Sequence, residues 1–481
     1  MTRPAFVLTR GDLRRIDPPD SAVRSYWMRD ALLAENDEIH RQPLRSRIHA
    51  DVCVVGGGFT GLWTAIELKR RDPSTEVTLI EAAVCGAGAS GANGGMAMNL
   101  WPKLSALIKQ GGEDEAVAVA RASVKAVDYL INFCEDNAID AQIYRTGWLW
   151  ASTNRSQDNS WDPAVEAAAS YRDSPFRVLD GQAASKLAGT RVRGGVVDDS
   201  CANLHPGLLV RGLARVAESM GIRIYEHTPL RALGSNAHAP VAITPFGEIR
   251  AASVVLAINA WATQIPSVRQ QLVMTASDNI VVKPAPGSYA PVTTAAGVSD
   301  AGRLLDYWRP LEDGTWLFGK AGLGLGYRTR GASTLFRPAP RLDNLIKQMH
   351  REFPALQGST MLSAWRAPVE YSLSSLPFFS NVPGYPRVFY GTGYSGDGVG
   401  PCVMGGWLLA SLATGVKDEL SESFLTRSPK GRRLPPEPIR FLGGQVVKAA
   451  MIRRDRLEDQ QKRVDPVTRM VTLIDPTSFV G

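Results

Sequence analysis

The sequence predicts an α/β fold, α+β overall, in which a domain with a parallel sheet is joined to a second domain with an antiparallel sheet. Residues 51–81 contain a strand, a glycine-rich turn, a helix and a strand, which together make one βαβ unit. Residues 279–328 instead alternate short strands with turns such as 284–287, a pattern typical of antiparallel strands. The chain therefore combines both kinds of sheet.

Composition and charge exclude several classes of protein. The 481 residues are 44% hydrophobic and 21% charged, which excludes collagen-like and low-complexity chains, and their number suggests two or three domains. The formal net charge is +7. Residues 427–456 hold nine basic and two acidic residues, which is also +7, so the rest of the chain is near neutral.

The five cysteines contain no CxxC pair, and the histidines show no metal-ligand spacing, so we expect neither disulfides nor a metal site. This cysteine usage favours a cytoplasmic location. The N-terminal residues lack the apolar core of a signal peptide. The uncharged stretch 398–416 contains Pro401 and several glycines, which favours a buried helix over a membrane span.

A dinucleotide-binding fingerprint begins the α/β domain. Gly56-x-Gly58-x-x-Gly61 follows the predicted strand 51–55 and precedes a predicted helix at 62–70. The glycines permit a tight turn, close approach of backbone N–H groups to a pyrophosphate and close packing of helix on strand. Glu81 ends the second strand and is expected to accept hydrogen bonds from ribose hydroxyls. This arrangement is that of a Rossmann-like domain.

Further motifs follow in a fixed order. A second glycine-rich loop, 86–95, comes directly after the second strand, where small residues let the chain pass beside a flat ring or phosphates. Shorter motifs stand at 25–27, 205–211, 228–230, 259–261, 318–320, 391–402 and 435–440. Together they resemble the D-amino acid oxidase superfamily of FAD-dependent oxidoreductases, and within it the γ-glutamylputrescine oxidase and putative aminophosphonate oxidoreductase branch.

The resemblance implies a Rossmann-like FAD-binding domain and a discontinuous substrate domain on an antiparallel sheet, of the glutathione-reductase-like, D-amino acid oxidase type. The expected divisions are an irregular N-terminal arm at 1–46, an FAD-binding domain at 47–105, 196–264 and 367–416, a substrate-binding domain at 106–195 and 265–366, and a basic C-terminal extension at 417–481. Three separated blocks therefore share the cofactor.

The resemblance also implies which residues contact FAD. In the first block they are Gly56, Gly58, Phe59, Thr60, Gly61, Glu81, Ala82, Ala89, Ser90, Asn93, Gly94, Gly95 and Met96. In the later blocks they are Leu230, Asn259, Ala260, Trp261, Gly393, Tyr394, Ser395, Gly396, Asp397, Gly398 and Val399. Ala367 stands where related sarcosine oxidases carry a flavin-linked cysteine, so the FAD is expected to be noncovalent.

Four residues are candidates for the reaction itself. Lys320 lies four residues before Gly324, which occupies the position of a lysine that assists oxygen reduction in sarcosine oxidases. Residues four apart on a strand share a face, so Lys320 either lies beside the flavin or is an exposed lysine. Arg309 and Arg366 either bind an anionic substrate or are structural. Tyr371 either lines an amine site or packs in the core.

The expected activity is FAD-dependent oxidation of a C–N bond in an amine, amino acid or aminophosphonate by hydride transfer. The imine product hydrolyses to a carbonyl compound, and electrons pass to oxygen or to another acceptor, as in a dehydrogenase. A flavin monooxygenase is a second possibility, although a second glycine fingerprint for NAD(P)H is missing. The basic segment 427–456 raises a non-enzymatic alternative, binding to a membrane surface, whereas no nucleic acid partner is expected. The sequence leaves the oligomeric state open.

Overall fold

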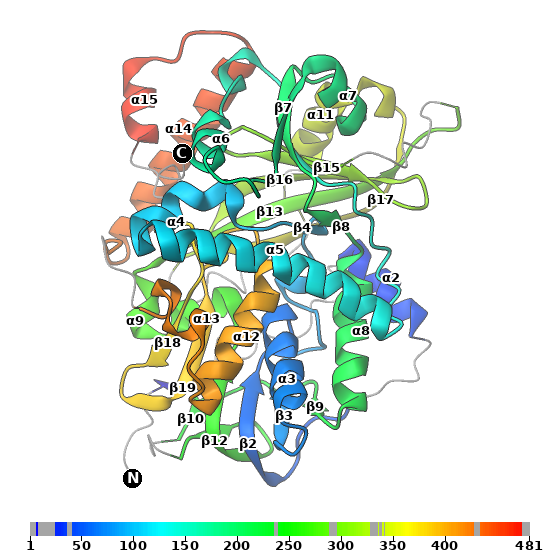
Figure 1. Ribbon diagram of the computed structural model, residues 1–481. Helices are drawn as coiled ribbons and strands as arrows, with labels where there is room; N and C mark the ends of the chain where they lie inside the picture. Colours follow the sequence, from blue (N-terminus) through cyan, green and yellow to red (C-terminus); the bar gives the residue numbers. More distant parts are fainter. Residues whose placement is uncertain are drawn as a thin grey trace.

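A computed structural model gives the structure of the chain (Figure 1). It describes residues 6–7, 25–35, 41–234, 239–287, 296–327, 335, 339–340, 342–427 and 433–473. Parts of the expected N-terminal arm, 1–5, 8–24 and 36–40, and of the basic extension, 428–432 and 474–481, lie outside the described residues.

A nine-stranded sheet forms the lower half of the molecule in Figure 1. Its strands are β1 (Phe6–Val7), β2 (Arg47–Val55), β3 (Val77–Ile80), β9 (Arg223–Tyr225), β10 (Ala232–Leu233), β11 (Val241–Ile243), β12 (Glu248–Leu256), β18 (Phe378–Val382) and β19 (Tyr385–Thr392). Strands β19, β12, β2, β3 and β9 pair in parallel in that order, so their carboxyl ends share one edge. The loops that follow β2, β3, β12 and β19 meet there.

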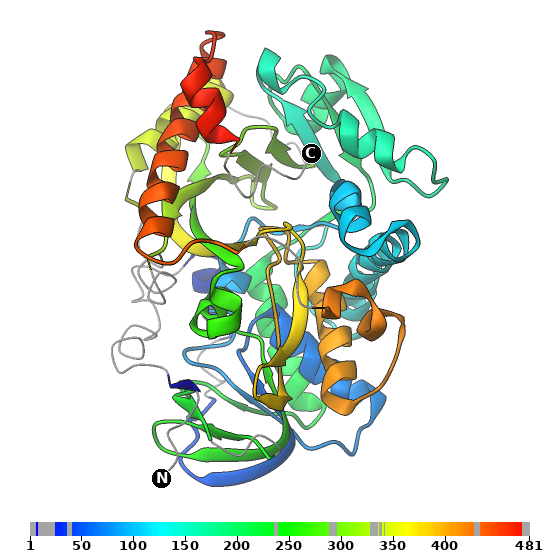
Figure 2. The ribbon, with the colours of Figure 1, turned by 90° about the vertical axis from the view of Figure 1, so that its left-hand side faces the viewer.

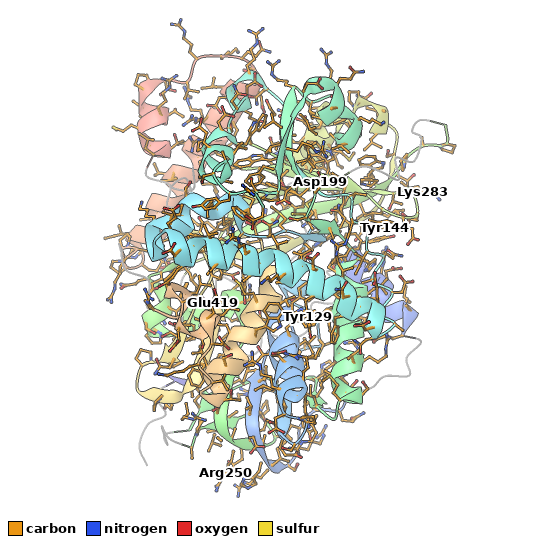
Figure 3. All side chains as sticks on the ribbon, viewed as in Figure 1. Tyr129, Tyr144, Asp199, Arg250, Lys283 and Glu419 are labelled. Carbon is orange, nitrogen blue, oxygen red and sulfur yellow. The ribbon has the colours of Figure 1, made fainter. Side chains whose placement is uncertain are left out.

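Four long helices pack on this sheet or on one another: α3 (Phe59–Arg71), α5 (Glu113–Asp136), α8 (Pro206–Ser219) and α12 (Pro401–Thr414). Tyr129 of α5, labelled in Figure 3, makes ring contacts with Trp63 of α3 at 5.8 Å and with Trp407 of α12 at 5.3 Å. The uncharged stretch around 401–414 is thus a core helix. Among the described residues, no helix combines the length and hydropathy needed to cross a membrane.

An eight-stranded sheet forms the upper half of the molecule (Figure 1), in the order β17-β13-β16-β15-β14-β5-β7-β6. Its strands are β5 (Trp148–Ser152), β6 (Phe176–Asp180), β7 (Gly194–Asp198), β13 (Leu272–Lys283), β14 (Gly297–Asp300), β15 (Asp306–Pro310), β16 (Trp316–Leu325) and β17 (Thr360–Ser372). All pairs are antiparallel except β14 with β5. Strands β7 and β17 extend across the expected boundaries at 195/196 and 366/367.

Helix α11 (Leu342–Glu352) packs on one face of this second sheet, where Leu345 and Met349 join a core with Trp308 and Phe318. Seven further helices and strands between β2 and α14 are short. They are β4 (Met96–Ala97), β8 (Ala202–Asn203), α4 (Leu104–Gly111), α6 (Asp162–Ala168), α7 (Gly181–Ala188), α9 (Pro266–Arg269) and α13 (Glu419–Glu422).

The N-terminal arm is not irregular throughout, because residues 26–34 form helix α2 (Tyr26–Ala34). The Ser25 hydroxyl caps it by accepting a hydrogen bond from the backbone N–H of Met28 at 3.1 Å. Glu35 then accepts hydrogen bonds from Arg211 of α8, with a closest N–O distance of 2.6 Å. A helix of nine residues shows little periodicity in sequence, and its contacts with distant segments stabilise it.

The basic extension forms two helices, α14 (Ile439–Asp459) and α15 (Pro466–Thr472). Helix α14 lies along the second sheet: Asp455 accepts a hydrogen bond from the Leu304 N–H at 3.1 Å, and Asp459 accepts one from Asn154 at 3.0 Å. Figures 1 and 2 show both helices at the outer edge of the upper half.

Candidate functional site

The fingerprint loop joins β2 to α3 with little room for side chains. Gly56 has a φ of +112°, and a Cβ atom there would lie 2.4 Å from the carbonyl oxygen of Ala257. A Cβ atom on Gly61 would lie 1.9 Å from the carbonyl oxygen of Gly56. The N-terminus of α3 therefore comes close to the end of β2, with its unpaired N–H groups and positive dipole at the edge where an anion would sit.

Glu81 lies beside this loop. Its carboxylate accepts hydrogen bonds from the backbone N–H groups of Gly57 at 2.7 Å and Ala83 at 2.9 Å. Burial raises the pKa of Glu81, an effect that these two hydrogen bonds oppose. The backbone N–H of Thr228 donates to the carbonyl oxygen of Glu81 at 2.7 Å, which brings the segment of Leu230 to the same place.

The second loop is held by side chains from distant segments. Trp27 of α2 donates from its indole N–H to the carbonyl oxygen of Asn93 at 2.8 Å, and Trp365 of β17 donates to that of Ala92 at 2.9 Å. Within the loop, the Asn93 side-chain oxygen accepts from Gly95 N–H at 2.8 Å, and the Ser90 hydroxyl accepts from Phe59 N–H at 2.9 Å. The last contact joins the second loop to the fingerprint loop.

The C-terminal loop, 393–399, joins the same group. Tyr394 and Thr60 are hydrogen-bonded through their hydroxyls at 3.0 Å, and the Thr60 hydroxyl also lies 3.0 Å from the Cys402 sulfur. Asp397 forms an ion pair with Lys103 at 2.6 Å, a contact that the sequence analysis missed because Lys103 stands in no motif. The loop leads into α12, whose N-terminus therefore lies close to that of α3.

Two buried polar atoms in the segment after β12 lack partners. The indole N–H of Trp261 and the side-chain oxygen of Asn259 have no hydrogen bond among the described residues. Trp261 faces the second loop, because a Cβ atom on Gly88 would lie 4.0 Å from its ring. Buried polar groups normally have partners, so these atoms fit a ligand with its own donors and acceptors. The glycine loops, the two helix N-termini and these orphan atoms together fit FAD.

Glu370 of β17 is a further polar group at this place, and it belongs to none of the sequence motifs. The residue is 2% exposed, and its carboxyl accepts a hydrogen bond from Gly393 N–H at 3.3 Å. Burial raises its pKa to about 7, while hydrogen bonds from Gly393, Tyr394 and Asn259 oppose the rise. An acidic residue in a largely apolar strand is the signal in the sequence that could have marked Glu370 as a site residue. The sequence does not indicate which loop its carboxyl contacts.

One face of the second sheet covers the second loop. Arg309 of β15 donates from Nε to the carbonyl oxygen of Gly94 at 2.9 Å and from Nη2 to that of Leu204 at 2.5 Å. Its guanidinium also lies over the Trp27 ring, 5.2 Å from the centroid. Burial lowers the pKa of Arg309 to about 9, so the group is charged at neutral pH.

Tyr307 stands two residues before Arg309 and therefore on the same face. A Cβ atom on Gly94 would lie 3.1 Å from its ring. The Tyr307 hydroxyl is hydrogen-bonded to Ser277 and Asn279 of β13, both at 2.6 Å. Tyr307 stands in no recognisable motif, and its spacing of two residues from Arg309 is the signal in the sequence that could have found it.

Lys320 lies on the opposite face of the same sheet. It pairs across the strands with Asp306, and its ammonium lies 2.9 Å from that carboxylate. Gln348 of α11 donates to the same carboxylate at 2.6 Å. Burial opposes the charge of Lys320, yet Asp306 and Asp300 raise its pKa. The structure therefore places Lys320 in an ion pair that faces α11. A spacing of four residues predicts a shared face of the strand, but it does not indicate which face meets the second loop.

Arg366 is also on this opposite face. It makes a bidentate ion pair with Asp278 of β13, and the Nη2–Oδ2 distance is 2.7 Å. Both side chains are almost fully buried, so the guanidinium is already neutralised. In this position the guanidinium of Arg366 is held by Asp278, as in the structural alternative that the sequence left open. Tyr371, in contrast, forms an antiparallel backbone bridge with Tyr394 of the C-terminal loop. A Cβ atom on Gly396 would lie 3.3 Å from the Tyr371 hydroxyl, so this side chain lies against the same loop.

Comparisons with known proteins agree with this arrangement. The family profile described as FAD dependent oxidoreductase matches residues 51–412. The chain is similar to the probable oxidoreductase OrdL of Haemophilus influenzae, at 27% identity over 89% of this chain and 96% of that protein. It is 28% identical to the gamma-glutamylputrescine oxidoreductase of Escherichia coli, over 77% of this chain and 85% of that protein. Glycine oxidase from Geobacillus kaustophilus shares the fold, with a TM-score of 0.62 at 20% identity, covering 79% of this chain and 99% of that one.

Proposed function

Since the chain belongs to the family of FAD-dependent oxidoreductases matched over residues 51–412, we propose that it oxidises a C–N bond in a small amine by removing a hydride equivalent. One observation carries the proposal. The fingerprint loop, the second loop and the C-terminal loop, called the cofactor segments below, converge under one face of the second sheet. Tyr307 and Arg309 project from that face toward the second loop, and Tyr371 lies against the C-terminal loop. A substrate held between these groups would lie beside the flavin.

When bound, FAD supplies the ring that accepts the hydride equivalent. The protein's own contribution is electrostatic and positional. The charged Arg309 and the N-terminus of α12 would stabilise negative charge at this place. The substrate nitrogen has to be neutral, because its lone pair forms the C=N bond as the hydride leaves. The resulting imine is then hydrolysed by water to a carbonyl compound.

The substrate class is inferred from two arginines whose guanidinium groups already bind other groups of the protein. Arg366 is paired with Asp278, and two nitrogen atoms of Arg309 donate to backbone carbonyls. Of these two arginines, both within the described residues, Arg309 would then offer a carboxylate or phosphonate Nη1 alone. This favours an amine over an amino acid or an aminophosphonate. The similarity to the gamma-glutamylputrescine oxidoreductase supports the same choice.

The test is anaerobic mixing of the yellow protein with amines, amino acids and aminophosphonates while the flavin absorbance near 450 nm is followed. Amines should bleach the flavin at least tenfold faster than amino acids of similar size. Bleaching by none of the three classes would contradict the proposal. Bleaching by NAD(P)H alone would instead support the second candidate, a flavin monooxygenase.

The flavin should be noncovalent, since Ala367 occupies the position of the linkage cysteine and the Cys402 sulfur contacts Thr60. Acid precipitation should release all of the yellow colour into the supernatant. Colour retained in the pellet would contradict this part of the proposal. The electron acceptor is tested separately, by admitting oxygen to the reduced protein and measuring hydrogen peroxide. Slow reoxidation would support a dehydrogenase with another acceptor.

A further inference from the structure

Exposed apolar side chains are concentrated on the two C-terminal helices. Among the described residues, 13 large apolar side chains are exposed, and six of them belong to α14 and α15 or their ends. These six are Ile439, Leu442, Val446, Val467, Met470 and Leu473, each 60% to 66% exposed. The other seven stand singly in separate parts of the chain. Scattered apolar residues are normal on a protein surface, whereas six on two helices that pack together indicate a surface with a partner. We call these six side chains the patch.

The patch is not the face by which α14 binds its own chain. That face carries Phe441, which contacts Tyr327 at 5.0 Å, and Met451, which is buried. Asp455 continues the same side, since it accepts a hydrogen bond from the Leu304 N–H. Leu442 and Val446 lie on the other side of the helix, so packing against the second sheet does not account for them.

The charges beside the patch have one sign. The exposed charged residues of 439–473 are Arg453, Arg456, Lys462, Arg463 and Arg469. The acidic residues of this segment are only partly exposed, and all four are engaged in contacts with other residues. Asp455 binds Leu304 N–H, Glu458 pairs with Arg454, Asp459 with Arg351 and Asp465 with Arg453. The helices therefore present apolar and basic side chains together.

We propose that this C-terminal surface, made of the six apolar and five basic side chains named above, docks on an anionic lipid surface. Apolar side chains would enter the boundary between headgroups and acyl chains, and the arginines and lysine would meet the lipid phosphates. Helices α14 and α15 stand at the outer edge of the upper half (Figures 1 and 2), so a flat surface could approach them there without first meeting another described helix or strand.

Charge and apolar character together select this partner. A nucleic acid would use the basic side chains but would leave six apolar ones unused. A symmetric second copy would bury the apolar side chains but would bring eight like charges close together, four from each copy besides the Arg453 that pairs with Asp465. An anionic bilayer matches both features at once. The proposal does not depend on the oxidation reaction, because none of these side chains belongs to the cofactor segments.

The experiment is sedimentation of the full-length flavoprotein with phosphatidylcholine vesicles that contain either none or 30% phosphatidylglycerol. Binding should require the anionic lipid and should fall in 0.5 M salt. The triple variant Leu442→Ser/Val446→Ser/Met470→Ser should lower the partition coefficient at least tenfold. The matched control Val178→Ser/Phe246→Ser/Val416→Ser removes exposed apolar side chains elsewhere and should bind as the unchanged protein does.

A second variant tests the charges separately. Arg456→Gln/Arg463→Gln/Arg469→Gln should weaken binding to anionic vesicles about fivefold per arginine, the equivalent of about 1 kcal/mol each. All variants should keep the flavin absorbance. Equal binding to neutral and anionic vesicles, or no loss in either triple variant, would overturn the proposal. So would tighter binding to DNA than to vesicles, or a dimer that the serine variant converts to a monomer without changing vesicle binding.

Discussion

The two sheets of this protein present functional groups in different ways. The parallel strands of the nine-stranded sheet all end at one edge, and their loops bring backbone N–H groups and small residues to that edge. The antiparallel sheet uses its two faces instead. Arg309 and Tyr307 project from one face onto the second loop, whereas Asp306 and Lys320 project from the other toward α11.

This difference determines what a single substitution can do. At the edge of the parallel sheet, backbone geometry is decisive, so glycines are the sensitive positions. On the antiparallel sheet, neighbouring residues of one strand belong to separate environments. Trp308 lies between Tyr307 and Arg309 in sequence, yet it packs in the core beside α11. The following predictions test this contrast, beginning with the largest expected effect on the flavin.

Gly58→Leu should give a colourless protein. A Cβ atom at this position would already lie 2.8 Å from the Ser90 hydroxyl, and a larger side chain would fill the space for a pyrophosphate at the N-terminus of α3. The flavin-to-protein ratio after purification measures the effect. Gly443→Ala is the control, since nothing lies within 4 Å of its added Cβ atom. Full flavin content in Gly58→Leu would show that this loop does not hold the cofactor.

Arg309→Met should slow anaerobic reduction of the flavin on the order of ten- to a hundredfold. It removes two hydrogen bonds from a charged group, each worth roughly 1.5–3 kcal/mol, and leaves the carbonyls of Gly94 and Leu204 unpaired. The second loop then loses the hydrogen bond that attaches Gly94 to β15. Stopped-flow absorbance measures the reduction rate. A rate within twofold of the unchanged protein would mean that this face of the sheet does not act on the flavin.

Glu370→Gln should make the protein more stable at pH 8 but not at pH 4. The folded-state pKa of Glu370 is raised to about 7 from 4.5, so the folded chain retains a proton that the unfolded chain releases. Stability is therefore lost as pH rises from 4.5 through 7, by at most about 3 kcal/mol. Glutamine stays neutral and still accepts the Gly393 hydrogen bond. Urea unfolding at both pH values measures the difference, and an equal effect at the two would contradict it.

Lys320→Met should have the smallest effect on the flavin. Both half-reactions should stay within twofold of the unchanged rates, because the ammonium lies on the face away from the cofactor loops. Stability should fall by roughly 3–5 kcal/mol, since Asp306 would remain buried without its cation. Lys320→Arg, which keeps the charge, should recover part of this loss. Slower reoxidation by oxygen alone would instead return Lys320 to the flavin, as the sequence first suggested.

The parts of the site that could be predicted are those with local signals. The glycines of the fingerprint loop, Glu81 and the second loop lie within about forty residues, and each has a requirement that only certain residues meet. Side chains of the antiparallel sheet carry no such signal. Periodicity shows that Lys320 and Phe318 share a face, but only the packing of α11 shows which face that is. Glu370 and Lys103 acquire their roles from loops distant in sequence.

The hydrogen bonds that Trp27 and Trp365 donate to the second loop link cofactor binding to the order in which the chain is synthesised. Ala92 and Asn93 are synthesised early, yet Ala92 is held by Trp365, and the C-terminal loop that completes the site comes later still. At roughly 5–20 residues per second, the intervening chain of about 300 residues takes on the order of 15 s to one minute to synthesise. During that time the fingerprint loop and its helix exist without their partners. The proposed FAD site therefore lacks its last segment until residues 393–399 have been made.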